Sequence, residues 1–184
     1  MPVSTTPRSA LPPEAADAQR LLFCVYRASV TDEFVDYNGH MNAMHYPLHF
    51  ENATCLFFEH LDISKRYQET RQHAMFAAEQ HMIYRSELRA GAPFLVQSQL
   101  LDVAPRLIRL FNAMRNAETG QLCCTQEMIF VHVSSASRRS APFPEDVRER
   151  LEFVRDAHAP AGWPSEAGKA IEVKKTTPVP KAIE

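Results

Sequence analysis

A long amphipathic helix is the strongest pattern of hydrophobic and polar positions in this chain. Its apolar residues recur at steps of 4, 3, 4 and 4 and therefore share one face of a 3.6-residue repeat: Tyr46, Phe50, Ala53, Phe57 and Leu61. Proline is tolerated in the first turn of a helix, so Pro47 places the helix start near Tyr46. The unpaired N–H groups of that turn then point back toward residues 36–42, where they can bind an anion or polarise a carbonyl oxygen.

The segments on either side of this helix have the pattern of strands. An apolar segment rich in β-branched and aromatic residues, Leu22–Val30, precedes the helix and predicts a first strand. Four further strands are expected over Met75–Tyr84, Phe94–Val103, Arg106–Asn116 and Gln121–Val133, with a hairpin turn at residues 118–120. Short links between consecutive strands favour an antiparallel meander, and the helix can bury its apolar face only by lying across that sheet. The pattern therefore predicts an α+β domain.

The remaining segments define the ends of that domain. Residues 63–70 are expected to form a short second helix or a cap over a cleft, and residues 142–158 contain a surface helix with acidic residues in its first turn. The proline-rich residues 1–20 predict a disordered N-terminal arm, and residues 159–184, rich in Pro, Ala and Lys, predict a flexible C-terminal tail. Residues 21–158 are then the folded domain.

Composition excludes several classes of function. The 184 residues are 45% hydrophobic and 23% charged with a net charge of −2, which indicates one soluble domain and suggests neither a nucleic-acid surface nor a membrane anchor. No apolar run approaches the ~20 residues of a membrane span, and no secretory signal is visible. The four cysteines, at positions 24, 55, 123 and 124, have no zinc-site spacing. A reduced, cytoplasmic protein is therefore expected.

The loop before the long helix carries the candidate chemistry. Asp36 supplies a carboxylate, Gly39 fits a sharp bend, and His40 and Asn42 offer hydrogen bonds around it. A carboxylate beside free helix-start amides can act as general base or nucleophile while those amides stabilise an oxyanion. From spacing alone, a capping loop in front of a core helix explains the same residues about equally well.

This loop resembles the signature of a known family. Hotdog-fold acyl-CoA thioesterases of the 4-hydroxybenzoyl-CoA thioesterase type are matched by Asp36-x-x-Gly39-His40-x-Asn42, followed by Tyr46 and Phe50-Glu51-x-Ala53. The resemblance extends over roughly residues 21–158 and implies the hotdog fold, a curved antiparallel sheet wrapped around one long helix. It also implies that Asp36 is the catalytic carboxylate, that Gly39, His40 and Asn42 shape the loop and orient the substrate, and that no cofactor or metal is needed. A homodimer or homotetramer that binds CoA at the subunit interface is implied as well.

Three longer segments resemble the betainyl-CoA thioesterases of carnitine and betaine breakdown. They are VDYNGHMN at residues 35–42, FAAEQHMIYRSELRAG at residues 76–91 and HAPAGWP at residues 158–164. A betainyl group carries a quaternary ammonium, which is held by aromatic faces and a carboxylate. The candidate substrate-binding residues are Tyr46, Phe57, Phe58, Phe76, Glu79 and Tyr84, and the candidate CoA-phosphate anchors are Arg85, Arg89, Arg138 and Arg139.

Other readings of the same residues remain open. Helix glutamates are catalytic in some hotdog enzymes, although Glu51 and Glu59 also fit a solvated helix face. His45 and His49 have metal-ligand spacing without an evident third ligand, and no GxSxG elbow is present. A hotdog hydratase is a minor alternative because the Asp-His spacing differs. The competing functions are a thioesterase for another short-chain, medium-chain or aromatic acyl-CoA and a non-catalytic acyl-CoA-binding module.

Overall fold

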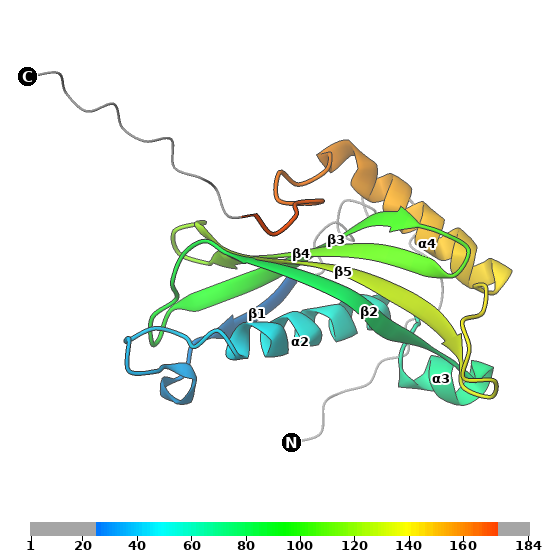
Figure 1. The fold of residues 1–184 in the computed structure, drawn as a ribbon, viewed down its shortest axis with the longest axis horizontal. Coiled ribbons are helices and arrows are strands. Elements are labelled where there is room, and N and C mark those ends of the chain that lie inside the picture. The colour runs from blue at the N-terminus through cyan, green and yellow to red at the C-terminus, as the bar shows by residue number, and fades with distance from the viewer. Residues whose placement is uncertain (1–24, 173–184) are drawn as a thin grey trace, which may run out of the picture.

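The structure is a computed structural model that describes residues 25–172 (Figure 1). Five strands form one antiparallel sheet: β1 (Val25–Ser29), β2 (His73–Tyr84), β3 (Pro93–Val103), β4 (Leu107–Asn116) and β5 (Leu122–Ser134). Three α-helices accompany the sheet, α2 (His45–His60), α3 (Lys65–Arg71) and α4 (Glu145–His158), with short 3-10 turns η1 (Asp32–Phe34) and η2 (Ala159–Ala161). The predicted arm, residues 1–20, lies outside the described residues, and the predicted tail is described only as far as residue 172.

The long helix α2 is the predicted amphipathic helix, and it begins at His45, one residue before the predicted start. It lies across one face of the curved sheet, which wraps around it (Figure 1). The predicted apolar face is the buried one, since Tyr46, Phe50, Ala53 and Phe57 are all within the core. Each large apolar side chain buried in this way stabilises the fold by about 1.5–3 kcal/mol. The predicted hotdog architecture is therefore confirmed.

The strand order differs from a simple meander at one edge. The sheet order is β1-β3-β4-β5-β2, so the predicted meander holds for β3, β4 and β5. The strand β2 does not pair with β3, which follows it in the chain, but lies at the opposite edge beside β5. Residues 85–92 carry the chain across the end of the sheet over three strand spacings, roughly 14 Å. A link of that length is not confined to a hairpin, which is why β2 can take the far edge.

The edge of β3 is closed by two different elements. Only residues 93–97 of β3 pair with the short strand β1, which would leave the second half of β3 as an open edge. Helix α4 packs there, and its buried residues Val147, Leu151 and Val154 join the core. The Leu100 N–H donates a hydrogen bond of 2.7 Å to His158 Nδ1 at the end of α4. An edge N–H thus receives a partner, which protects the sheet from pairing with other chains.

Among residues 25–172, no helix combines the length and apolarity that a membrane span requires.

A chain of buried polar side chains crosses the sheet beneath α2 and separates two apolar clusters. Asn112 is at its centre: its Oδ1 accepts from the Ser98 hydroxyl at 2.7 Å, and its Nδ2 donates to Thr54 Oγ1 at 3.1 Å and to Gln126 Oε1 at 2.9 Å. Gln126 Nε2 in turn donates to Gln80 Oε1 on β2 at 3.1 Å. These bonds join four strands to α2, and their geometry fixes the position of the helix on the sheet.

Replacing Asn112 by leucine would leave the Ser98, Thr54 and Gln126 groups without this partner in the core. We expect the Asn112→Leu variant to lose about 2–4 kcal/mol of unfolding free energy, because buried polar groups that lose their partners cost about 1–3 kcal/mol each. Urea denaturation measures the change. The matched control is Gln97→Leu. Gln97 is next to Ser98 in β3 and lies on the other face of the sheet, so a change within about 0.5 kcal/mol is expected. Equal stability of the two variants would contradict a role of the polar chain in fixing the fold.

Candidate functional site

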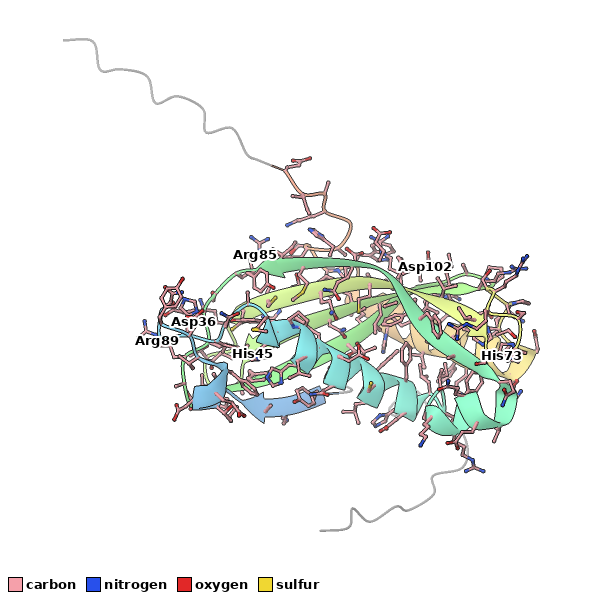
Figure 2. The ribbon with its side chains drawn as sticks, turned by 60° about the horizontal axis from the view of Figure 1, so that its bottom comes forward. Asp36, His45, His73, Arg85, Arg89 and Asp102 are labelled. Carbon is pink, nitrogen blue, oxygen red and sulfur yellow. The ribbon has the colours of Figure 1, made fainter. Side chains whose placement is uncertain are left out.

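The loop between η1 and α2 is closed by its own backbone. Val35 and Met41 form an antiparallel bridge, the Asp36 N–H donates to the His40 carbonyl at 3.2 Å, and the Gly39 N–H donates to the Asp36 carbonyl at 2.9 Å. Gly39 has φ of +80°, a left-handed conformation that glycine adopts without steric cost. The predicted sharp bend at Gly39 is therefore present, and it presents the Asp36 side chain at one end of the molecule (Figure 2).

The Asp36 carboxylate is held by two donors from its own loop. Its Oδ1 accepts from the Asn38 backbone N–H at 2.8 Å, and its Oδ2 accepts from Asn42 Nδ2 at 2.9 Å. The backbone hydrogen bond from Asn38 lowers the pKa of Asp36, with smaller contributions in the same direction from Asn42 and from the nearby His40, while partial desolvation opposes them. The group is therefore a carboxylate at neutral pH, as a general base or a nucleophile must be.

Asn42 connects this carboxylate to the start of α2. Its Oδ1 accepts from the Met44 N–H at 3.0 Å, and its backbone carbonyl accepts from the His45 N–H at 3.0 Å. Pro47 has no N–H to donate. Within the described residues, the first turn of α2 therefore leaves the N–H of Tyr46 for a substrate oxygen. The Asp36 carboxylate and the start of α2 are thus linked through a single asparagine.

A hollow of about 330 Å³, here called the Tyr46 pocket, opens beside this loop. It is lined by His40, Met41, Ala43, Tyr46, Tyr84, Arg85, Ser86 and Glu87. The rings of Tyr46 and Tyr84 meet edge to face, with centroids 5.3 Å apart and planes at 87°. Burial raises the pKa of Tyr46 to about 12, so its hydroxyl stays neutral. Asp36 does not line the pocket itself, but it belongs to the same loop as His40 and Met41, which do.

The Tyr46 pocket brings together three candidate residues, His40, Tyr46 and Tyr84, and it also contains Glu87, which sequence reasoning missed. Glu87 lies in the irregular link after β2, where neither periodicity nor a motif marks it. Its carboxylate accepts from Arg89 Nε at 2.8 Å, and His40 pairs with Arg89 through a backbone bridge. The link 85–92 is thus attached directly to the Asp36 loop.

Four predicted substrate-binding residues do not line this pocket in one copy of the chain. Phe57 is 1% exposed and packs in the core near α4, as does Phe58, because both lie two turns or more beyond the helix start. Phe76 and Glu79 pair with Val131 and Ile129, which puts both on the sheet face opposite α2. A β-bulge between Ala77 and Glu79 causes this arrangement, since strict alternation would place residues 76 and 79 on opposite faces.

The predicted phosphate anchors divide between the two ends of the molecule. Arg85 lines the Tyr46 pocket and forms an ion pair with Glu166 at 3.0 Å, and Arg89 lies beside Asp36 (Figure 2). Arg138 and Arg139 belong to the turn after β5, where the Arg138 N–H donates to the Ser134 carbonyl and Ser134 pairs with His73. Figure 2 shows His73 at the far end from Asp36, so one copy of the chain cannot bring Arg138 to the site.

The two helix histidines serve packing. His49 is buried between Phe34 and Phe94, with ring centroids at 5.2 and 4.7 Å, and its Nδ1 bonds to the Tyr26 hydroxyl at 3.1 Å. Burial lowers the pKa of His49, and the neighbouring His45 adds to that effect. His45 packs on Phe34 at 4.7 Å, so both rings support η1, which leads into Asp36. Within residues 25–172, no three His, Cys, Asp or Glu side chains gather in a way that could hold a metal ion.

Comparisons with known proteins show which family this chain resembles. The family model described as the thioesterase-like superfamily matches residues 30–151. A betainyl-CoA thioesterase of Pseudomonas aeruginosa is 32% identical over 146 residues, which cover 79% of this chain and 92% of that protein. An L-carnitine dehydrogenase/betainyl-CoA thioesterase of Rhizobium meliloti is 27% identical, and this chain spans only 29% of its length. Among solved structures, a Staphylococcus aureus protein in complex with CoA is 27% identical with a TM-score of 0.78, covering 83% of this chain and 96% of that one.

The ionisation of Asp36 can be tested directly through Asn42. The Asn42→Ala variant loses the Nδ2 hydrogen bond that favours the carboxylate, so we expect the pKa of Asp36 to rise toward its ordinary value. A pH titration followed by ¹³C NMR of the carboxyl carbon measures it. Because the folded pKa is lowered, the stability that this group contributes is present above the unfolded pKa of about 4 and is lost as pH falls through the folded value.

The matched control for this titration is Asn52→Ala. Asn52 lies on the exposed side of α2, where its amide donates to Tyr26 rather than to the loop. Its replacement should leave the Asp36 midpoint unchanged. An Asp36 pKa that is the same in the wild type and in Asn42→Ala would show that Asn42 does not hold the carboxylate.

Proposed function

The chain belongs to the thioesterase-like superfamily, and from this premise we propose that it hydrolyses betainyl-CoA to glycine betaine and CoA. The observation that carries the proposal is the Asp36 carboxylate, which Asn38 and Asn42 keep ionised beside the start of α2. The acyl group is taken from the Pseudomonas aeruginosa relative, which covers most of the folded domain. The reaction as proposed uses only side chains and backbone of this protein, with no metal or further cofactor.

In this mechanism Asp36 and the amide of Tyr46 act on opposite sides of the thioester carbonyl. The carboxylate either accepts a proton from the attacking water or attacks the carbonyl carbon itself, and both routes require it to be ionised. Negative charge then grows on the carbonyl oxygen, where the Tyr46 N–H and the helix dipole stabilise it. Breakdown of the tetrahedral intermediate releases the CoA thiolate, which takes up a proton. With water as the nucleophile the acid is formed in this step, whereas on the other route a water molecule then hydrolyses the mixed anhydride with Asp36, which releases the acid and restores the carboxylate. Asn42 sets the relative position of the two groups because it bonds to both the carboxylate and the helix start.

The Tyr46 pocket supplies the groups that a quaternary ammonium needs. A methylated cation makes no classical hydrogen bond and is recognised by aromatic faces, at about 0.5–2 kcal/mol per ring. Tyr46 and Tyr84 provide two rings at right angles, and Glu87 provides the carboxylate that sequence reasoning sought in Glu79. Arg85 in the pocket lining and Arg89, which is bridged to His40, are the proposed phosphate anchors of CoA on this side.

Thiol release from a panel of acyl-CoAs tests this proposal. The panel comprises betainyl-, acetyl-, medium-chain and 4-hydroxybenzoyl-CoA, each with wild type and Asp36→Asn. We expect betainyl-CoA to be preferred and the variant to lose about 10²–10⁴-fold in kcat, because it removes the ionised base or nucleophile. Preference for another thioester would show that the proposed acyl group is wrong, while the proposed role of Asp36 would stand. Binding of all four without thiol release by the wild type would instead favour an acyl-CoA-binding module.

We further propose that two copies of the chain associate along β2. This strand has 12 residues and lies at the sheet edge, where its outer backbone groups are open to a second strand. Exposed apolar side chains include Tyr84 at the end of β2, Met44 just before α2 and Leu48 in its first turns, and the Tyr84 hydroxyl contacts the Ala43 carbonyl next to Met44. A homodimer that joins the two sheets, or a tetramer of such pairs, would cover them. The free thiols Cys55, Cys123 and Cys124 and a CoA substrate fit a cytoplasmic location.

A charge at this surface should separate the copies. We expect the wild type to have the mass of a dimer or tetramer in light scattering, and Leu48→Glu to shift it toward the monomer, because the new carboxylate would be buried against the partner. The matched control is Phe153→Glu, which adds the same charge at an exposed apolar position of α4. A monomeric wild type, or equal masses for both variants, would contradict association along β2.

A further inference from the structure

The chain beyond α4 does not leave the domain directly but crosses the sheet face opposite α2 (Figure 1). Residues 159–169, here called the strap, are attached at both ends. Gln99 Nε2 donates to the Gly162 carbonyl at 2.8 Å, and the Gly168 N–H donates to Glu127 Oε2 at 2.8 Å. Between them, the guanidinium of Arg109 lies 4.8 Å from the centre of the Trp163 ring. The strap is therefore packed on the folded domain, although residues 159–184 were predicted to form a flexible tail.

A cavity of about 270 Å³, here called the strap cavity, lies between the strap and the sheet. Its floor is formed by outward-facing side chains of β3, β4 and β5, among them Gln97, Phe111, Leu122 and Thr125, and its roof by Pro164, Ser165 and Glu166. Phe111 is 3% exposed and forms a buried apolar base for this floor. The amide of Gln97 and the hydroxyl of Thr125 offer donors and acceptors. A flat heteroaromatic ring with polar edges fits such a lining.

The charges around this cavity favour an anion. Arg115 lines the cavity, and among the described residues the Gly120 carbonyl accepts one of its five guanidinium donors, at 3.1 Å. The carboxylate of Glu166 is shared by Arg85 at 3.0 Å and Lys169 at 3.8 Å. The hydrogen bond from the Ser165 hydroxyl lowers the pKa of Glu166, and the charges of Lys169 and Arg85 act in the same direction. Arg85 and Lys169 thus balance the charge of Glu166, and Arg115 is the cation of the cavity lining. Arginine is well suited to bind phosphate oxygens through paired N–H groups.

The strap cavity and the Tyr46 pocket lie on the two sides of one ion pair. Arg85 is part of the lining of the Tyr46 pocket, and its partner Glu166 is part of the lining of the strap cavity. A ligand that occupies both hollows must pass over this pair and must carry different chemistry at its two ends. Acyl-CoA has that form, with a thioester at one end and an adenine nucleotide with phosphates at the other.

We propose that the strap cavity binds the nucleotide end of CoA, with the adenine against Phe111 and the phosphates toward Arg115. This inference rests on the proposed function, because it assumes that the thioester of the same molecule reaches the Tyr46 pocket. It gives the strap a role in substrate binding. It also assigns to CoA recognition an arginine and an aromatic residue of the outer sheet face.

Binding is tested with 3′,5′-ADP, which represents the nucleotide end without pantetheine. Trp163, the only tryptophan of the chain, lies on the strap next to Pro164 and reports occupation of the cavity by its fluorescence. We expect calorimetric binding of 3′,5′-ADP by the full-length protein with a saturable change in Trp163 emission at the same concentrations. Arg115→Gln should weaken both at least about tenfold, as the loss of a charged hydrogen bond does. Arg138→Gln, the same change at the far end of the sheet, should bind like the wild type.

Kinetics separate the nucleotide end from the reacting end. Arg115→Gln should raise KM for the acyl-CoA about tenfold, leave kcat unchanged, and leave KM for the corresponding acyl-pantetheine unchanged because that substrate has no nucleotide. Gln97→Leu, which changes the floor without touching the Gly120 turn, should act in the same direction. 3′,5′-ADP should inhibit competitively against acyl-CoA.

Several results would overturn this inference without affecting the proposed function. They are binding of 3′,5′-ADP without a change in Trp163 emission, no binding at all, non-competitive inhibition, or equal KM values for Arg115→Gln and wild type while thiol release continues. Absence of thiol release from both acyl-CoA and acyl-pantetheine by the wild type would instead refute the proposed function itself.

Discussion

Burial of one apolar helix face is the constraint on which the rest of this structure depends. Helix α2 presents Phe50 and Phe57 along a single stripe, and only a sheet curved around it can cover that stripe over its whole length. A curved sheet of five strands still has two edges. Helix α4 closes part of one edge, with His158 accepting the N–H of Leu100, whereas β2 leaves the other edge open. The polar chain through Asn112 then fixes where the helix lies, because apolar contacts alone are not directional.

The candidate active site is a consequence of where this buried helix begins. Because α2 is fixed by its apolar face, its first turn points to one end of the sheet, and the loop before it must lie there too. Asn42 uses its side chain and backbone to satisfy the helix start and to hold Asp36. The stability of the core and the position of the carboxylate are thus linked through a few hydrogen bonds. His45 and His49 add to this by packing on Phe34 beneath the loop.

The strap on the outer face of the sheet is connected to the end of the molecule where the candidate active site lies. The link after β2 contributes Glu87 and Arg85 to the Tyr46 pocket, and Arg85 also meets Glu166 of the strap. The Arg85–Glu166 ion pair therefore joins the segment that follows α4 to the link 85–92, and the bridge between Arg89 and His40 joins that link to the Asp36 loop. The exposed part of this pair is screened by solvent and contributes little to stability by itself, so its significance lies in the position it gives to the two segments.

The sequence by itself determined what depends on local order. The steps from Tyr46 to Leu61 defined the helix, Pro47 defined its start, and the spacing of Asp36, Gly39 and Asn42 defined the loop, because helix periodicity and turn geometry act over a few residues. Only the tertiary structure decided which strands pair and which face each residue takes. The placement of β2 beside β5, the bulge that turns Phe76 and Glu79 outward, the distance of Arg138 from Asp36, and the strap on the sheet all arise from contacts between residues far apart in the chain. Such contacts leave no periodic trace, since a strand pattern specifies that a segment has two faces but not what covers each of them.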